Sequence, residues 1–178
     1  MVDDMTKKEI IIGIDQSITG TGWFVDRENY GVIKPKKREL GDIRRIIEIR
    51  EELKEIFKKY KPTIVVMENY SFGSKFRGAF LGELGGMIKI VCHDMGLKLI
   101  LIPPTKLKMF MTGKGNSKKE VMLLYCYKNY GFETIDNNIA DAFSLYQLYK
   151  EYMEWKEGKK YSTKKVECFK KVDKNGGT

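Results

Sequence analysis

Short runs of β-branched and other apolar residues alternate along this chain with longer stretches in which apolar residues recur every three or four positions. Residues 9–15 (EIIIGID) and 63–67 (TIVVM) are continuous apolar runs, which are typical of strands buried on both faces. Three more strands are expected at residues 23–25, 30–33 and 97–102, the first of them after a turn at residues 20–22. The strands at residues 23–25 and 30–33 would form an antiparallel meander with residues 9–15.

Helical periodicity occupies most of the remaining chain. Apolar residues repeat at helical spacing from Ile43 to Tyr60, after a start signal at Gly41-Asp42 and before a stop at Lys61-Pro62. Further helices are expected at residues 79–95, 105–111, 119–130 and 137–155. The order of these elements predicts an α/β fold, in which a mixed sheet combines the meander with parallel strands joined by crossover helices.

We expect one domain over residues 1–155 and a basic C-terminal tail over residues 156–178. The chain has 178 residues, which is enough for a single hydrophobic core. The tail holds eight lysines against three acidic residues and shows little hydrophobic periodicity. An ordered appendage and a flexible arm both remain open for it.

The net charge of +9 favours a polyanionic partner such as nucleic acid, although a basic balance also serves solubility. No apolar run approaches the roughly 18–20 residues that span a bilayer, so no membrane association is expected. The first nine residues are charged rather than apolar, unlike a signal peptide. We therefore expect a cytoplasmic protein of a bacterial or phage-infected host cell.

Cysteine and histidine offer little to a catalytic or zinc site. The three cysteines (Cys92, Cys126 and Cys168) are scattered without a CxxC pair, and His93 is the only histidine. A zinc site and a mechanism with histidine as general base are therefore not expected. Carboxylates remain as the route to activating a water molecule.

Three acidic residues stand where this fold would bring them together. Asp15 ends the first strand, Glu68 follows the second buried run, and Asp141 lies in the first turns of the last helix. Their oxygen ligands suit Mg²⁺, or Mn²⁺ in its place, and two such ions can promote hydrolysis of a phosphodiester. Asp15 could instead cap a turn, whereas Glu68, after an apolar run, would be costly to bury unpaired. Asp136 is better placed as a helix N-cap.

Four segments in order resemble the RuvC-family Holliday junction resolvases, especially their phage-type branch, over residues 9–150. They are GIDQSITGTG, VVMENYSFG, PPTKLKMFMTGKGNSKKEV and DNNIADAFSL. The resemblance implies a ribonuclease-H-like fold, a homodimer and paired nicks in branched DNA at a four-way junction. It identifies the chain as a magnesium-dependent, structure-specific endodeoxyribonuclease, and two-metal hydrolysis would leave 5′-phosphate and 3′-hydroxyl ends.

Residue by residue, Asp15, Glu68 and Asp141 match the metal-binding carboxylates of that family. The resemblance puts Asn138 where the family often has an acidic residue or histidine, so Asn138 is the expected fourth ligand, with Asp136 or Asn137 as substitutes. Lys108 and Lys118 match basic positions that face the scissile DNA and would assist catalysis. The alternative is that both are ordinary surface lysines.

DNA contacts are expected from two loops. Aromatic and basic residues alternate after Glu68, which suits stacking on unpaired bases, although a core or dimer-interface role is an equal alternative. The expected contacts in this loop are Tyr70, Phe72, Lys75 and Arg77. In the basic segment further along, they are Lys106, Lys114 and Asn116.

Two rival functions remain open from the sequence. The segment IGIDQSITGTG also resembles the first phosphate-binding loop of sugar kinases and actin-like ATPases, which need a second domain that 178 residues do not accommodate. The second rival function is that of a catalytically inactive protein that binds branched DNA. Its only support is Asn138, which stands where the family often has an acidic residue or histidine. Replication forks and flaps are alternative substrates that the sequence does not rank against junctions.

Overall fold

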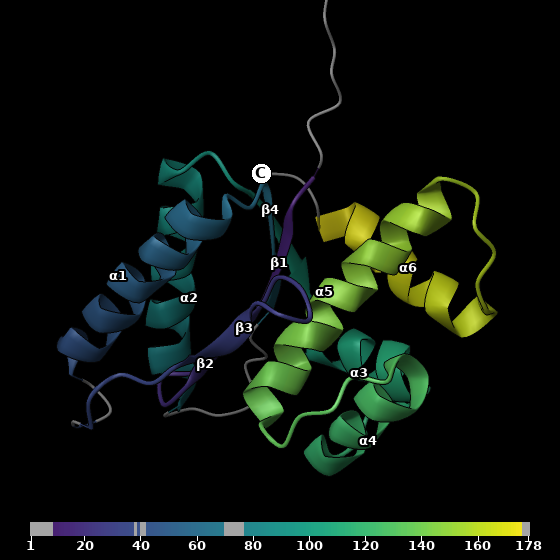
Figure 1. Ribbon diagram of the computed structural model, residues 1–178, viewed down its shortest axis with the longest axis horizontal. Helices are drawn as coiled ribbons and strands as arrows, with labels where there is room; N and C mark the ends of the chain where they lie inside the picture. Colours follow the sequence, from purple (N-terminus) through teal and green to yellow (C-terminus); the bar gives the residue numbers. More distant parts are fainter. Residues whose placement is uncertain (1–8, 38, 40–41, 70–76, 176–178) are drawn as a thin grey trace, which may run out of the picture.

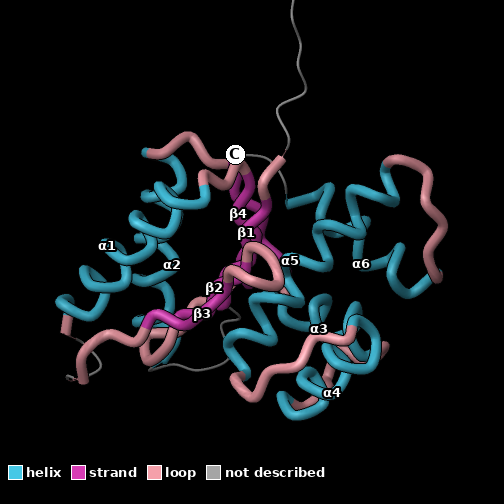
Figure 2. Tube along the Cα trace, in the orientation of Figure 1, coloured by secondary structure: helices cyan, strands magenta, loops and turns pink. Residues whose placement is uncertain are grey.

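The computed structural model describes residues 9–37, 39, 42–69 and 77–175, with side chains from residue 78 to residue 172 in the last segment. These residues form one five-stranded sheet in the order β3-β2-β1-β4-β5 (Figures 1 and 2). Strands β1 to β3 are antiparallel neighbours, and β1, β4 and β5 are parallel. Their bounds are Ile11–Asp15, Thr21–Phe24, Tyr30–Ile33, Ile64–Glu68 and Lys98–Ile102. The mixed sheet confirms the expected fold class.

Helices cover both faces of this sheet (Figure 1). One face carries α1 (Ile43–Tyr60) and α2 (Arg77–Asp94), and the other carries the four remaining helices. Those four are α3 (Pro104–Thr112), α4 (Lys119–Tyr130), α5 (Asn137–Lys156) and α6 (Thr163–Asn175). Among the helices of the described residues, none combines the length and apolarity needed to cross a membrane.

The two-residue period of the strands divides the core into two layers. Ile12 and Ile14 of β1 belong to the cluster beneath α1 and α2. Val66 and Ile64 of β4 belong to the cluster beneath α5. Since side chains alternate along each strand, Asp15 and Glu68 share the α5 face with these two residues of β4.

Glycines let α5 approach this face closely. A Cβ atom on Gly13 would lie only 2.1 Å from the carbonyl oxygen of Ala142, and one on Gly22 would lie 2.2 Å from that of Asn138. No side chain fits in either gap, so the backbone of α5 rests directly on β1 and β2. Asp141 lies between these two contact points of α5, which brings its carboxylate to the end of β1.

Most helix boundaries follow the sequence signals. Asp42 caps α1 by accepting a hydrogen bond from the Arg44 backbone N–H, and Lys61 ends the helix in the left-handed conformation. Asp136 caps α5 through the Asn138 N–H, as expected. The turn expected at residues 20–22 is wrong in part, because Thr21 and Gly22 already pair with β3.

The basic tail contains an ordered helix, which settles the alternative left open for residues 163–175. Three residues of α6 are buried in the cluster beneath α5: Cys168, Phe169 and Val172. The ring of Phe169 packs against Trp155 at the end of α5 and against Phe110 of α3. The helix therefore shares the core of the preceding residues, while its Lys164, Lys170 and Lys171 are exposed.

Candidate active site

The three predicted carboxylates meet at one end of the sheet. Ile14 of β1 lies opposite Met67 of β4, so the next residues, Asp15 and Glu68, end adjacent parallel strands on the same face. Asp141 reaches them from the second turn of α5, just beyond the cap at Asp136. Asp15 and Asp141 are buried, with 8% and 9% of their surface exposed, and Glu68 is half-buried.

The pKa values of these carboxyl groups show how strongly they are coupled. Burial raises the pKa of Asp15 well above its usual value, and the charges of Asp141 and Glu68 raise it further. Burial and then Asp141 raise the pKa of Glu68 to about 7. Burial raises the pKa of Asp141 to about 6. Three carboxylates held close together in a largely buried site repel one another when they are charged, so this end of the sheet favours a cation.

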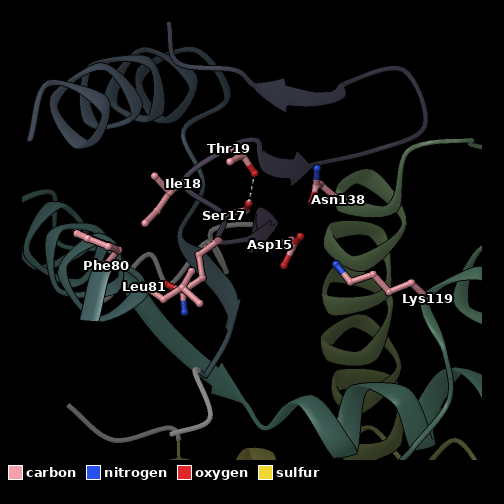
Figure 3. A pocket seen from close by; sticks show the side chains of 9 residues that line it. Asp15, Ser17, Ile18, Thr19, Phe80, Leu81, Lys119 and Asn138 are labelled. Atoms are coloured by element: carbon pink, nitrogen blue, oxygen red, sulfur yellow. Dashed lines mark hydrogen bonds between the residues drawn. The ribbon is translucent and has the colours of Figure 1, made fainter. Parts of the chain in front are cut away.

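Two lysines partly offset this repulsion, and one is not the residue expected. Lys119 at the start of α4 lowers the pKa of all three carboxyl groups, and Lys108 of α3 lowers those of Glu68 and Asp141. Lys118 is exposed and does not enter into any of these three pKa shifts. The helix geometry of α4 thus turns Lys119, the neighbour of the predicted lysine, toward the carboxylates, as Figure 3 shows for Asp15.

Gln16 belongs to the site although the sequence analysis did not single it out. Its side-chain amide donates a hydrogen bond of 3.0 Å to the main-chain carbonyl of Glu68, which ties the end of β1 to the end of β4. The amide oxygen of Gln16 is buried and has no hydrogen-bond partner. Its position directly after Asp15 was the only available signal, because a polar residue there also fits an ordinary turn.

Asn138, the expected fourth ligand, lies beside Asp15 and Lys119 at the rim of a pocket (Figure 3). Its backbone carbonyl faces Gly22, which leaves the side chain at the open end of the sheet. The amide oxygen of Asn137 is buried without a partner. A role for either amide as a metal ligand stays a prediction.

The donor set fits a hard divalent cation. Carboxylate and amide oxygens are the ligands that Mg²⁺ prefers, and the raised pKa values reflect first of all the burial of these three carboxyl groups. As they stand, no three His, Cys, Asp or Glu side chains among the described residues form a group that could enclose an ion. The three carboxylates are therefore neighbours rather than a closed cage in this structure.

The remaining predicted residues are distributed as follows. Lys106 of α3 faces α6, since its charge lowers the pKa of the Cys168 thiol, while Lys114 and Asn116 are exposed in the loop before α4. Tyr70, Phe72 and Lys75 lie outside the described residues, as does the side chain of Arg77. The loop contacts with DNA therefore stay predictions.

Histidine and cysteine take no part in the site. The imidazole of His93 is 91% exposed at the end of α2. Cys92, Cys126 and Cys168 are free and buried, and burial raises the pKa of each thiol.

Two known proteins with similar sequences carry the same name. The crossover junction endodeoxyribonuclease RuvC of Synechococcus sp. (strain WH7803) is 25% identical over 151 residues, covering 76% of this chain and 94% of that protein. The RuvC of Chlorobium phaeovibrioides is 29% identical over 121 residues, covering 62% of this chain and 64% of that protein. No protein-family model matches the chain.

The fold comparison agrees. RuvC of Thermus thermophilus superimposes with a TM-score of 0.68 at 20% identity, covering 83% of this chain and 96% of that one. The same protein in complex with a Holliday junction substrate gives a TM-score of 0.69 at 19% identity, with the same coverage. In sequence, this chain is similar to proteins named crossover junction endodeoxyribonuclease RuvC, and its fold is similar to that of Thermus thermophilus RuvC.

Proposed function

We propose that this protein is a structure-specific endodeoxyribonuclease that resolves four-way DNA junctions with Mg²⁺ as its cofactor, Mn²⁺ being able to replace it. One observation carries the proposal: Asp15, Glu68 and Asp141 meet where β1 and β4 end and α5 begins, and each is buried or half-buried and has a raised pKa. The relatives named as crossover junction endodeoxyribonucleases support the choice of substrate. The cytoplasm, where such DNA lies, is its proposed location.

Different residues of the chain would have different roles in phosphodiester hydrolysis. Asp15, Glu68 and Asp141 would hold the divalent cation, which supplies activated water and stabilises the leaving 3′-oxygen. Gln16 fixes the separation of β1 and β4 through its hydrogen bond to the Glu68 carbonyl. Lys119 and Lys108 are close enough to the carboxylates to shift their pKa values, so they are placed to stabilise charge on the phosphate under attack.

A homodimer is the second part of the proposal. Gly82 and Gly86 lie one helical turn apart on α2, and a Cβ atom on either would meet nothing within 4 Å. A groove between α1 and α2 runs beside them and includes the exposed side chains of Ile43, Ile47 and Ile90. Exposed isoleucines beside a glycine stripe suit a helix of a second copy, which would provide the two active sites that paired nicks require.

Replacing Ile90 by Arg tests the dimer. Ile90 is 63% exposed, so the change should leave the folded monomer intact while placing a charge in the proposed interface. Light scattering should show a dimer for the wild type and a monomer for Ile90→Arg. Leu124→Arg is the matched control, because Leu124 is similarly exposed on α4. A wild type that is monomeric while it nicks both strands of a junction would contradict this part of the proposal.

The decisive experiment for the activity is a cleavage assay on synthetic four-way junction, fork, flap and duplex DNA. With Mg²⁺, we expect paired nicks in the junction, 5′-phosphate ends, and little cleavage of duplex. The same panel without divalent cation should show binding and no cleavage. Binding to the junction with no cleavage of any substrate, under Mg²⁺ or Mn²⁺, would instead indicate a catalytically inactive binder.

A further inference from the structure

A pocket of about 340 Å³ opens directly beside Asp15, within the size range of roughly 300–1,000 Å³ that is usual for ligand sites. It lies between the loop that joins β1 to β2, the first turn of α2, and the N-terminal ends of α4 and α5 (Figure 3). The residues that line it are Asp15, Gln16, Ser17, Ile18, Thr19, Phe80, Leu81, Lys119 and Asn138. The activity proposed above uses only one edge of this pocket.

The walls of the pocket differ in chemistry. Ile18, Phe80 and Leu81 form an apolar side on the α2 side of Asp15, while Asn138 and Lys119 stand on the α5 side (Figure 3). An apolar wall provides no ligands for a metal ion, and an aliphatic ligand could not form hydrogen bonds with the polar side chains opposite it. The combination suits a flat group with apolar faces and a polar edge.

Gln16 adds an unsatisfied acceptor to the same pocket. Only 8% of Gln16 is exposed, and its amide N–H group is committed to the Glu68 carbonyl, so the buried amide oxygen is left without a donor. A buried acceptor without a partner is unfavourable, and a donor on a bound ligand would relieve it once the Gln16 side chain turned this oxygen toward the pocket. The ring edges of nucleobases carry such donors.

We propose that this pocket receives one unpaired nucleobase of the strand being cut, from a nucleotide next to the scissile phosphate. The inference rests on the proposed junction-cleaving function and names a feature of its substrate. The base faces would pack on Phe80 and Leu81, and the base edge would meet Gln16 and Asn138. Because Asp15 forms the rim, a base seated here places its own backbone phosphate at the carboxylates, so unpairing at a junction and cleavage become linked.

A cycle that combines protein and DNA changes tests this proposal. Thr19→Trp would fill the pocket from an exposed loop position, and Leu81→Trp would fill it from α2. The DNA change removes a single base, one position at a time, around the cut site of a four-way junction. In the wild type, base removal at one position next to the cut should slow cleavage about tenfold, in keeping with the loss of one stacked base. In either filled variant the same removal should change the rate less than about twofold.

Leu124→Trp, on the outer surface of α4, is the matched control and should keep the wild-type response to base removal. Thermal unfolding of each variant checks folding, and Thr19→Trp serves alone if Leu81→Trp is unfolded. Suppose instead that base removal has the same effect in the wild type and in the filled variants at every position. That result would contradict the proposal of a base-binding pocket, but it would not contradict the proposed nuclease activity.

Junction affinity, measured in the absence of divalent cation, provides a readout that does not depend on cleavage. The loss of affinity on base removal should be several-fold larger in the wild type than in Thr19→Trp. If no junction is cut but this difference is observed, the pocket proposal survives and the catalytic proposal fails. If the effect of base removal on affinity and on cleavage is the same with and without the pocket-filling substitution, no base occupies the pocket.

Discussion

Two clusters of buried charge lie on the same face of the sheet, and they are built in opposite ways. At the end of β1, three carboxylates face one another with two lysines at their edge. At the far end of α5, Glu151 is equally buried, with 5% of its surface exposed, but it is surrounded by partners. In the first cluster the two lysines only partly offset the charge of the three carboxylates, whereas in the second a lysine contacts the single carboxylate directly.

Two partners of Glu151 come from other helices, and a third, Gln147, lies on α5 itself. Tyr130 of α4 donates a hydrogen bond of 2.7 Å to one carboxylate oxygen, and Lys165 of α6 contacts the other at 2.6 Å. The ammonium group of Lys165 also lies over the rings of Phe110, Tyr130 and Tyr161, at 4.7 to 5.6 Å. This arrangement fixes α6 to the domain.

The comparison separates charges that serve structure from charges that serve function. A buried carboxylate with a hydrogen-bonded cation needs no ligand, whereas one beside two other carboxylates is stable only when protonated or when a cation is added. The carboxylate cluster therefore should tolerate removal of charge without loss of stability, and the Glu151 cluster should not. The predictions below test this contrast, beginning with the largest effect.

Neutralising one carboxylate of the first cluster should abolish cleavage without unfolding the protein. Asp15→Asn or Glu68→Gln is expected to slow junction cleavage on the order of a thousandfold, because a ligand of the cation is lost. The thermal midpoint should stay equal or rise, because repulsion between buried carboxylates is relieved. Cleavage assays and thermal unfolding measure the two effects. Retained cleavage in both variants would show that the site lies elsewhere.

Breaking the second cluster should have the opposite outcome. Lys165→Met leaves Glu151 buried without its cation and is expected to reduce the free energy of unfolding by about 3–5 kcal/mol. The junction cleavage rate of the remaining folded protein should be unchanged, because Lys165 does not affect the carboxylates of the site. Denaturant unfolding measures the loss. The double variant Lys165→Met with Glu151→Leu should recover much of it; no recovery would mean that packing of α6, and not charge, was lost.

The raised pKa values predict how stability depends on pH. A carboxyl group whose pKa is higher in the folded chain than in the unfolded chain binds its proton more tightly when folded, so its contribution is present below pH 4 and is lost as the pH rises. With folded pKa values of about 6 for Asp141 and about 7 for Glu68, stability should fall between about pH 4 and pH 7.

The size of that fall should be about 3 kcal/mol for each of Asp141 and Glu68 in the absence of divalent cation, since one pKa unit corresponds to about 1.4 kcal/mol. Denaturant unfolding across this pH range measures it, with Glu68→Gln as the control that should flatten the slope. Adding Mg²⁺ should also flatten it, because a bound cation stabilises the charged carboxylates. A slope that is the same in the wild type and in Glu68→Gln would show that Glu68 does not contribute to the pH dependence.

The smallest effect distinguishes two adjacent lysines. Lys119→Met is expected to slow cleavage about tenfold and to increase the pH-dependent loss of stability, because its charge lowers the pKa of all three carboxyl groups. Lys118→Met, its exposed neighbour, should behave as the wild type in unfolding and change cleavage by less than about threefold. Cleavage rates measured at saturating protein concentration show which of the two lysines assists catalysis. The reverse order would support the assignment made from the family resemblance.

Several features could be predicted because they depend on local patterns. The apolar runs around β1 and β4, the caps at Asp42 and Asp136, and the placement of acidic residues at strand ends all follow from short-range chemistry. Helix α6 was harder to predict because its apolar positions, Val166, Phe169 and Val172, are few and are surrounded by lysines. Its helical form depends on burial against Phe110 and Trp155, which no local window contains.

The sequence by itself determined the kinds of side chain available for catalysis: carboxylates and lysines, with a single histidine and no cysteine pair. It also determined that β1 and β4 end in acidic residues, since that is written in consecutive positions. Tertiary structure decided which of those residues meet. Gly13 and Gly22 admit the backbone of α5, so Asp141 reaches Asp15. The start of α4 turns Lys119 rather than Lys118 toward them, and Gln16 closes the end of the sheet. These choices depend on distances between segments far apart in the chain, which only packing sets.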